Sequence, residues 1–483
     1  MPWVDRVVSR HPRIRVFLAR RLDAHVFEGL PFTILCVSLV LIFVFLGGVI
    51  EDYLTNDTLV LLDARLTNLL YTFRTEGALK FFYFLTLFCE ASVVVVVAVV
   101  ASVFLWKHRY RIYVPGLWTA LGIGEGLAIL GKLAFQRPRP DVMMRAITET
   151  SFSFPSGHAS TVVPLYGYFV YLLLKSKADV RTKRLAIAGF VVLVLLIDFS
   201  RLYLGVHYLS DVIAGNLIGL IGLIVAIGIT EWMIARRTEI RMQVTKFSPI
   251  VGGLCVALFG AAVLYAASPV QISSRELPDM QDIHIGDVSA LFEGKVLPRF
   301  TETITGAYQE PISLVVIAPK ECFVADVAKA GWVLADDVTW KSTARFLKDA
   351  TLDKTYPTAP MTPSFFDAEP HDYGFQKPTE ENSIRARHHA RFWDTNYETP
   401  FGELYLGTVS LDVDTKWGGI THRIAPDIDS ERDVFVSDFI NAGIVVYSTV
   451  FQFVPPTLGE NFAGDPFFTS GQAAFVVLTP CGK

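Results

Sequence analysis

Three short segments, KLAFQRPRP (residues 132–140), PSGH (155–158) and SRLYLGVHYLSD (200–211), interrupt runs of sequence that are otherwise almost entirely apolar. They supply basic groups, two histidines and a carboxylate. An ionisable side chain within or beside a bilayer is expensive and is by default a functional candidate. The three segments therefore indicate a polar site at the ends of membrane helices.

The composition indicates a polytopic membrane protein, because hydrophobic residues make up 52% of the 483 residues. Most of the apolar runs reach the roughly 20 residues that cross a bilayer. The run at 159–174 is short and can span only if the helix continues through His158 into the headgroup layer. We predict spans at 31–50, 81–106, 113–135, 159–174, 185–204, 212–232 and 249–267.

Charge divides the chain into two parts: residues 1–267 carry a net charge of +9 and residues 268–483 a net charge of −13. Such asymmetry favours a membrane half followed by a separate soluble half. We predict an α-helical polytopic membrane bundle followed by a soluble α+β domain. The predicted boundaries are a basic cytoplasmic segment at 1–30, a transmembrane domain at 31–248, a seventh span at 249–267 and a soluble domain at 268–483.

Lysine and arginine predict the orientation, because short cytoplasmic loops are enriched in them. Of the 26 such residues before position 268, 18 lie in the N-terminal segment and in alternate loops. This pattern predicts a multi-pass protein of the cytoplasmic membrane. The three motifs and, after an odd number of spans, the C-terminal half would then face the periplasmic side. The basic N-terminal segment fits an interfacial helix or a solvated tail that only sets the topology.

The motif residues match the needs of phosphate ester hydrolysis: neutralisation of charge, a nucleophile and an acid for the leaving oxygen. Arg139 and Arg201 offer forked donors for phosphate oxygens, and Lys132 offers a point charge. Ser156 is placed as the N-cap of the helix that follows it, where free N–H groups bind anions. Gly157 would let a phosphate approach the backbone closely.

The two histidines are candidates for the catalytic groups. His207 and Asp211 are four residues apart and share a face on a helix, so the carboxylate can orient the imidazole as a nucleophile. Attack on phosphorus would give a phosphohistidine. His158 is placed to protonate the leaving alkoxide and then to activate the water that releases phosphate.

Taken together, Lys-x6-Arg-Pro, Pro-Ser-Gly-His and Ser-Arg-x5-His-x3-Asp resemble the motifs of the type 2 phosphatidic acid phosphatase (PAP2) superfamily, which includes the vanadium haloperoxidases. The resemblance covers residues from about 80 to 232. It implies a metal-independent phosphatase without a cofactor, built on a six-helix core. It also implies the same roles: Lys132, Arg139, Ser156, Gly157 and Arg201 bind phosphate, His158 is the acid, His207 the nucleophile and Asp211 its partner.

Other charged residues near the motifs have more than one interpretation. Arg137 and Arg145 fall outside the matched positions and are interpreted as headgroup contacts or surface charges. Glu125 lies two helical turns before Lys132 and either buffers its charge or forms a helix–helix hydrogen bond. Asp198 is predicted to hold the stem of Arg201.

The C-terminal half alternates strand-like stretches at 312–318, 404–411, 444–454 and 473–478 with helical patterns near 322–330, 338–349 and 429–442, which is typical of an α+β domain. Residues 355–377 are predicted as a long loop. The segment RARHHARFW (385–393), with His422 and PDIDSERD (426–433), resembles an LssY-like C-terminal domain, which has no settled activity.

The basic segment in this half also leaves alternatives open. Arg385, Arg387, His389 and Arg391 can line one face of a strand, either to bind an anion or to pair with acidic neighbours across the sheet. A metal site from His388, His389, His422 and Asp427 matches no standard zinc spacing, and no metal is predicted. Cys322 and Cys481 form a possible disulfide if this half faces an oxidising compartment.

Our leading hypothesis is a lipid-phosphate phosphatase whose substrate is a polyprenyl diphosphate, phosphatidate, phosphatidylglycerophosphate or lipid A phosphate. A lipid-binding or transport protein whose soluble domain engages an envelope partner is the alternative, although no internal repeat is evident. Vanadate-dependent haloperoxidase chemistry suits a membrane setting less well. The expected partners are the bilayer and its lipid phosphate, and the basic segments suggest no nucleic acid.

Overall fold

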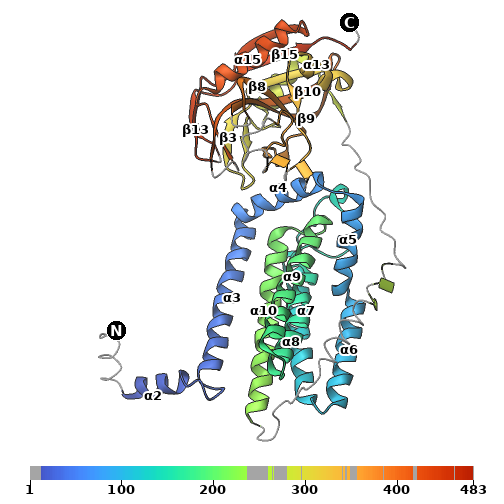
Figure 1. Ribbon diagram of the computed structural model, residues 1–483, viewed down its shortest axis with the longest axis vertical. Helices are drawn as coiled ribbons and strands as arrows, with labels where there is room; N and C mark the ends of the chain where they lie inside the picture. The colour runs from blue at the N-terminus through green and yellow to red at the C-terminus, as the bar shows by residue number, and fades with distance from the viewer. Residues whose placement is uncertain are drawn as a thin grey trace. The chain divides into compact units, whose positions relative to one another are not determined.

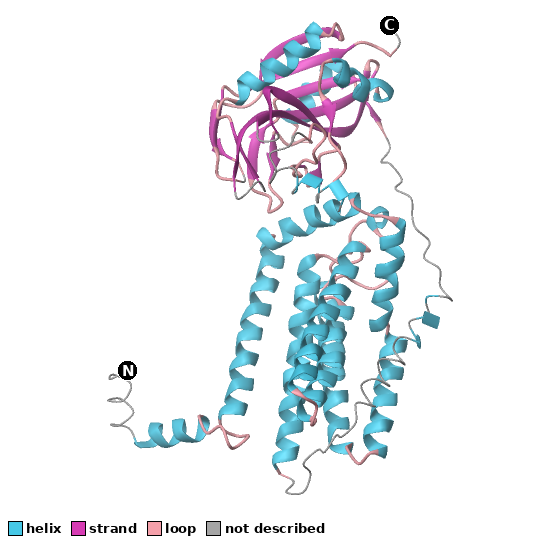
Figure 2. Cartoon of the chain, in the orientation of Figure 1, coloured by secondary structure: helices cyan, strands magenta, loops and turns pink. Residues whose placement is uncertain are grey.

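The computed structural model describes residues 12–236, 259, 260, 262, 263, 265, 280–294, 296–339, 341, 342, 345, 346, 348, 356–383, 386–416, 421–461 and 463–481. The chain divides into two compact units, Met1–Arg275 and Glu276–Lys483. The first is helical, and the second is rich in strands (Figure 2).

Helices account for nearly all of the described part of the first unit (Figure 1). They are α2 (Pro12–Arg21), α3 (Leu30–Thr55), α4 (Thr58–Thr72), α5 (Glu76–Thr86), α6 (Ala91–Lys107), α7 (Val114–Phe135), α8 (Gly157–Lys175), α9 (Val180–Tyr203) and α10 (Leu209–Ala235). Single 3-10 turns lie at η1 (Leu87–Cys89), η2 (Arg111–Tyr113) and η3 (Val142–Met144).

Among the described residues, four helices are long and apolar enough to span a membrane: α3, α7 together with η2, α9 and α10. They correspond to the spans predicted at 31–50, 113–135, 185–204 and 212–232. The predicted fold class, a helical membrane bundle followed by an α+β unit, is confirmed. Most of the span predicted at 249–267 lies outside the described residues.

The span predicted at 81–106 is not one continuous helix. It is divided between α5 and α6, which are bent by 46° at the break, where Glu90 adopts an extended conformation. A break within a membrane leaves backbone carbonyls without partners, and these must be satisfied by the protein. The hydroxyl of Tyr166 donates a hydrogen bond to the carbonyl of Phe88 (3.0 Å) and so satisfies one of them.

The span predicted at 159–174 corresponds to α8, which begins two residues earlier and is not among the span candidates. Its lower hydropathy follows from its position, since it packs against α7, α9 and α10 and 14 of its residues are buried (Figure 1). Glycines allow its neighbours to approach closely: a Cβ at Gly124 would lie 2.7 Å from the carbonyl of Ser160, and one at Gly215 would lie 2.6 Å from that of Ser156. The first turn of α8 is therefore held at the centre of the bundle.

The second unit is built around a nine-stranded mixed sheet with the order β12-β15-β4-β10-β9-β8-β5, to which β1 and β11 are added at β9 and β10. Its strands are β1 (Gln281–Asp282), β4 (Leu314–Ala318), β5 (Val333–Leu334), β8 (Tyr373–Ser383), β9 (Ala386–Thr399), β10 (Gly402–Lys416), β11 (Thr421–Ile424), β12 (Val445–Gln452) and β15 (Gln472–Leu478). Most neighbours are antiparallel, but β15 pairs with β4, and β1 with β9, in parallel.

Shorter elements complete this unit. They are η4 (Ile285–Asp287), α12 (Val288–Glu293), β2 (Phe300–Glu302), β3 (Tyr308–Pro311), α13 (Lys320–Lys329), β6 (Phe365–Phe366), β7 (Glu369–Pro370), α15 (Ile428–Asn441), β13 (Thr457–Glu460) and β14 (Pro466–Thr469). Strands β3, β2, β6 and β7 form a second sheet, and β13 pairs with β14.

The four predicted strands correspond to β4, β10, β12 and β15, which are consecutive neighbours in the large sheet. The predicted helices near 322–330 and 429–442 correspond to α13 and α15, whereas that at 338–349 lies partly outside the described residues. The predicted loop at 355–377 is wrong in its second half, because β6 and β7 lie within it and β8 begins at Tyr373. Cys322 of α13 and Cys481, which follows β15, are joined in a disulfide.

Candidate active site

Helix ends bring the three motifs together at one end of the bundle. Lys132 lies in the last turn of α7 and Arg201 in the last turn of α9. His158 lies in the first turn of α8, and Asp211 in the first turn of α10. The segment 136–156, which contains Arg139, connects α7 to α8 beside them.

Arg139 and Arg201 converge on a single carboxylate, Glu149, which the sequence analysis did not single out. Nη2 of Arg201 donates to Oε1 of Glu149 (2.6 Å), and Nη2 of Arg139 lies 3.5 Å from Oε2. Both arginine side chains are buried. Burial alone would raise the pKa of Glu149, but the charges of Arg201 and Arg139 outweigh it and lower that pKa below its ordinary value. Two forked donors therefore already surround one anionic group.

His207 lies between Arg139 and Asp211. Its Nδ1 is 3.4 Å from Oδ2 of Asp211, and its Nε2 is 3.2 Å from Nη1 of Arg139. Burial, followed by the charge of Arg139, lowers the pKa of His207 well below its ordinary value. The imidazole is therefore neutral, with one nitrogen facing the carboxylate and the other facing the arginine pair.

The start of α8 faces the same space. Nε2 of His158 lies 3.5 Å from Nη1 of Arg201. Ser156 is the N-cap residue, but its side chain makes no capping bond, and among the described residues its buried Oγ has no hydrogen-bond partner. A Cβ at Gly157 would meet nothing within 4 Å. The helix N-terminus, the serine hydroxyl and open space beside glycine are the features that an oxyanion requires.

Lys132 lies at the edge of this arrangement. Its Nζ donates to the carbonyl of Phe152 (2.5 Å) and lies 3.4 Å from Oγ of Ser151. Arg139 also binds Ser151, through its carbonyl (2.7 Å) and its hydroxyl (3.0 Å). Lys132 therefore holds the same loop as Arg139 and adds positive charge near the site.

Arg137 is not a surface charge or a headgroup contact. Its side chain is buried and bridges two carboxylates at 2.8 Å each, Asp211 through Nη1 and Asp63 of α4 through Nη2. Asp63 in turn accepts a hydrogen bond from the backbone N–H of Ser210 (2.9 Å). A buried charge must be paired, and the carboxylate beside the candidate nucleophile supplies one partner. Sequence reasoning missed Asp63 because it lies far from the motifs, on α4, a helix that the sequence analysis did not predict.

Two acidic residues inside the membrane helices bind side chains of neighbouring helices. Glu125 accepts a hydrogen bond from the hydroxyl of Thr161 on α8, the helix–helix alternative. Asp198 accepts a bond from Asn216 (2.6 Å) on α10, so the predicted pairing with Arg201 is wrong. Helix packing decided both cases, and spacing along one helix could not reveal a partner on another.

In the second unit, His388 and His389 point to opposite faces of β9, as consecutive strand residues do. His388 pairs with Glu431 (2.7 Å) and His389 with Asp412 (3.1 Å). Within the described residues, no cluster of three or more histidine, cysteine or acidic side chains could hold a metal. Asp427 is the N-cap of α15, and the side chain of His422 lies outside the described residues.

Comparison with protein families divides the chain in the same way. Residues 112–236 match the model of the PAP2 superfamily, and residues 294–473 match the model named LssY C-terminus. Phosphatidylglycerophosphatase B from Bacillus subtilis (strain 168) is 40% identical over 89 residues, which are 18% of this chain and 42% of that protein. The chain thus spans less than half the length of this relative.

Two solved structures are similar to the chain. The first transmembrane PAP2 type phosphatidylglycerolphosphate phosphatase from B. subtilis aligns with a TM-score of 0.37 and 24% identity, over 42% of this chain and 98% of that one. LpxE from Aquifex aeolicus aligns with a TM-score of 0.29 and 25% identity, over 34% and 94%.

Proposed function

We propose that this chain, with a PAP2 segment in its membrane half and an LssY C-terminus segment in its second unit, is an integral-membrane lipid-phosphate phosphatase. The observation that carries the proposal is the convergence of Arg139 and Arg201 on the carboxylate of Glu149. His207 lies beside Arg139 and His158 beside Arg201. A phosphoryl group is also anionic and has more oxygens that accept hydrogen bonds than a carboxylate has. It would therefore displace Glu149 from the two guanidinium groups.

In the proposed first step, Nε2 of His207 attacks phosphorus while the bond from phosphorus to the lipid oxygen breaks. Asp211 accepts the bond from Nδ1–H and stabilises the charge that develops on the imidazole. Arg139, Arg201 and the N-terminus of α8 bind the equatorial oxygens, whose charge increases in the transition state. The product is a phosphohistidine.

His158 completes the cycle. It protonates the departing alkoxide, or the departing phosphate of a diphosphate substrate, and so becomes neutral; in the second step it takes a proton from water and returns to its protonated form. That water attacks the phosphohistidine and releases inorganic phosphate. Apart from water, the proposed reaction draws only on side chains and backbone N–H groups of the chain itself, and no proposed step requires a metal.

The position of the site supports a lipid substrate. The site lies at the ends of α7 and α9, helices long and apolar enough to span a membrane, where a headgroup meets protein. The distribution of basic loops supports placing this end on the periplasmic side of the cytoplasmic membrane. The name of the B. subtilis relative makes phosphatidylglycerophosphate the first substrate to test, beside polyprenyl diphosphate, phosphatidate and lipid A phosphate.

The test is phosphate release from these lipids by the full chain in mild detergent with excess chelator. The native protein should release phosphate in chelator, and His207→Ala should reduce the rate on the order of a thousandfold or more. His25→Ala, which changes an exposed histidine, is the matched control. If no lipid is hydrolysed, or if His207→Ala equals the native protein, lipid binding or transport replaces the proposal.

A further inference from the structure

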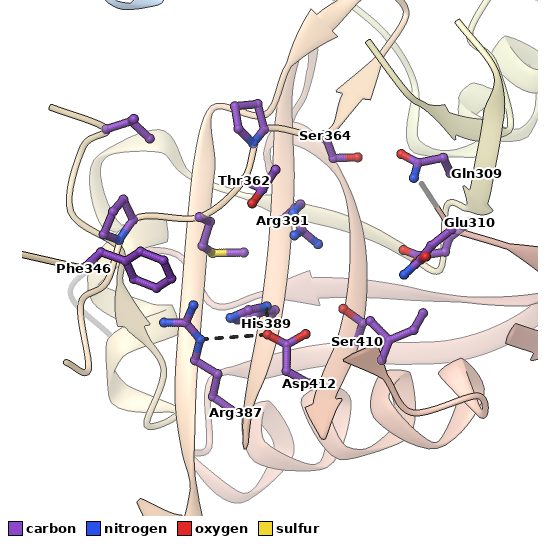
Figure 3. Close-up of a pocket in the computed structure, with 16 residues that line it drawn as sticks. Gln309, Glu310, Phe346, Thr362, Ser364, Arg387, His389, Arg391, Ser410 and Asp412 are labelled. Atoms are coloured by element: carbon purple, nitrogen blue, oxygen red, sulfur yellow. Dashed lines mark ion pairs between the residues drawn. The ribbon is translucent and has the colours of Figure 1, made fainter. Parts of the chain in front are cut away.

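A second polar cavity lies in the strand-rich unit. It has a volume of about 260 Å³, and Figure 3 shows the side chains that line it. Strand β9 contributes basic groups, β10 contributes Ser410 and Asp412, β3 contributes Glu310, and the segment 360–364 forms part of the wall. The volume approaches the lower end of small-molecule sites, roughly 300–1,000 Å³.

The basic groups come from alternate positions of β9. Arg387, His389 and Arg391 all line the cavity, whereas the intervening His388 faces α15 and pairs with Glu431. The period of two places the three cations on one face of the sheet. Arg387 and His389 are each only 4% exposed.

Partners within the protein satisfy these cations unequally. Nδ1 of His389 lies 3.1 Å from Oδ2 of Asp412, and Nε of Arg387 lies 4.0 Å from the same oxygen. Nη1 of Arg387 donates to Oε1 of Gln376. By contrast, within the part of the chain that the structure describes, Arg391 forms no ion pair or side-chain hydrogen bond, and its buried Nε has no partner.

The nearby carboxyl groups do not balance this charge fully. Asp412 is shared between Arg387 and His389, and burial raises its pKa to about 7. Burial also raises the pKa of Glu310, opposed by the charge of Arg391. Burial lowers the pKa of Arg387 to about 10, so it remains charged at neutral pH. A guanidinium kept at a cavity without a partner costs free energy that a bound anion would offset.

We propose that this cavity binds a small molecule carrying a phosphoryl group, with Arg391 and Arg387 donating to the phosphoryl oxygens. Forked donors suit that group, and the remaining volume fits a small polyol such as glycerol. Ser410 and the pair of His389 with Asp412 face the same ligand. The phosphoryl group can belong to a soluble ester or to a lipid headgroup. The site is separate from the membrane site and does not depend on the proposed phosphatase activity.

The test measures binding of radiolabelled inorganic phosphate to the full chain in detergent by equilibrium dialysis. The background is His207→Ala, which prevents turnover. We expect two phosphates per chain. Arg391→Gln should remove one of them or weaken it about tenfold or more, and Arg201→Gln should remove the other. Arg423→Gln, a change of an exposed arginine in β11 of the same unit, should retain both.

The two proposals fail in different ways in this experiment. If Arg391→Gln binds phosphate as its parent does, the cavity proposal is overturned. If Arg201→Gln has no effect while Arg391→Gln abolishes all binding, the cavity proposal stands and the proposed membrane site fails. Competition by glycerol 3-phosphate would identify a soluble ligand, and competition only by short-chain phosphatidate would identify a lipid headgroup.

Two further measurements separate binding from folding. In the protein whose second unit carries no substitution, phosphate should slow amide hydrogen exchange in peptides from β9. If saturating phosphate does not slow this exchange, the proposed cavity site is contradicted. Arg391→Met should unfold at the same or a higher temperature than its parent without phosphate, because it removes a buried donor, Nε, that has no hydrogen-bond partner among the described residues. It should also lose the stabilisation by phosphate. A lower unfolding temperature with that stabilisation retained would assign Arg391 a purely structural role.

Discussion

Glu149 occupies the space between the two arginines that we expect to bind phosphate, so substrate and carboxylate compete for the same donors. We predict that Glu149→Gln lowers KM for a lipid phosphate by about tenfold, since charge-assisted bonds to the arginines contribute about 1.5–3 kcal/mol. Initial rates of phosphate release give KM and kcat separately. Glu76→Gln, a change of an exposed carboxylate paired with Lys80, serves as the control.

The opposite result has a clear meaning. If Glu149→Gln raises KM or lowers kcat with KM unchanged, the carboxylate orients Arg139 and Arg201 for the substrate and does not compete with it. Inhibition by inorganic phosphate separates the cases further, because competition predicts tighter phosphate binding in the variant.

His371 makes the second unit sensitive to acid. Its Nδ1 accepts a hydrogen bond from the N–H of Ser364 (3.3 Å), which requires the neutral ring. Burial, followed by the charge of Arg391, lowers its pKa to about 3. The unfolded chain binds this proton near pH 6.5, so the stabilisation is complete above that pH. It is lost as the pH falls towards 3, by up to about 1.4 kcal/mol per pH unit.

We therefore predict that hydrogen exchange in β8 and β9 of the full chain accelerates between pH 6.5 and 4.5, after correction for the intrinsic exchange rate. His371→Asn keeps an acceptor for Ser364 and should flatten this dependence. His284→Asn, which changes an exposed histidine, should leave it unchanged. Equal slopes in the native protein and His371→Asn would show that other groups control acid sensitivity.

At the residue scale, the sequence indicated which motif residues would lie together at helix ends, because each motif brings its own chemistry within a short segment, while the role of each residue stays a prediction. The N-cap position of Ser156 follows from local helix geometry. The predicted shared helix face of His207 and Asp211 is wrong, because His207 precedes α10 and contacts Asp211 from the segment before the helix. Glu149 and Asp63 could not be predicted in this way. A single carboxylate in a loop or on a distant helix carries no periodicity, and only tertiary packing places it against an arginine.

At the scale of elements, α4 holds the site through Asp63. We predict that Asp63→Asn destabilises the membrane unit by about 3–5 kcal/mol, because it leaves the charge of Arg137 only partly compensated in a buried position. It should also lower kcat, because Arg137 contacts Asp211 directly. Thermal unfolding in detergent and phosphate release measure the two effects.

Asp57 of the same region provides the control for α4. It is the exposed N-cap of the helix and accepts from the N–H of Thr58 (2.6 Å). Since asparagine caps helices as well as aspartate does, Asp57→Asn should behave as the native protein. Native stability and activity in Asp63→Asn would instead mean that Asp211 is positioned without α4.

Hydropathy predicted the long spans. It did not predict that the run at 81–106 is divided between α5 and α6, or that α8 is enclosed by its neighbours. The break at Glu90 interrupts an apolar run, and the bond from Tyr166 to the freed carbonyl of Phe88 helps the bundle to tolerate it. Helix α8 carries polar groups because the bundle encloses it. In the second unit, the four most apolar strands were evident, and the alternation of Arg387, His389 and Arg391 indicated the strand face of β9 that lines a cavity.

At the scale of the whole molecule, the disulfide between Cys322 and Cys481 connects two positions 159 residues apart in sequence. Closing so long a loop restricts the unfolded chain, and removing the bond should cost about 2–5 kcal/mol. We predict that Cys322→Ser, Cys481→Ser and the double variant all unfold at the same lower temperature. Reductant should lower the unfolding temperature of the native protein to that value and leave the unfolding temperatures of the variants unchanged. Cys36→Ser, a change of an exposed cysteine in α3, should retain the native response.

The same bond tests the predicted orientation of the chain. Disulfides persist in oxidising compartments and are rare in the cytosol, and the basic loops together with an odd number of spans predict the periplasmic side for the second unit. In intact cells, a membrane-permeant thiol reagent should therefore leave Cys322 and Cys481 unmodified unless reductant is added first. Labelling of both cysteines without reductant would place this unit in a reducing compartment. The prediction of a periplasmic second unit would then be wrong, either in the side given by the basic loops or in the odd number of spans.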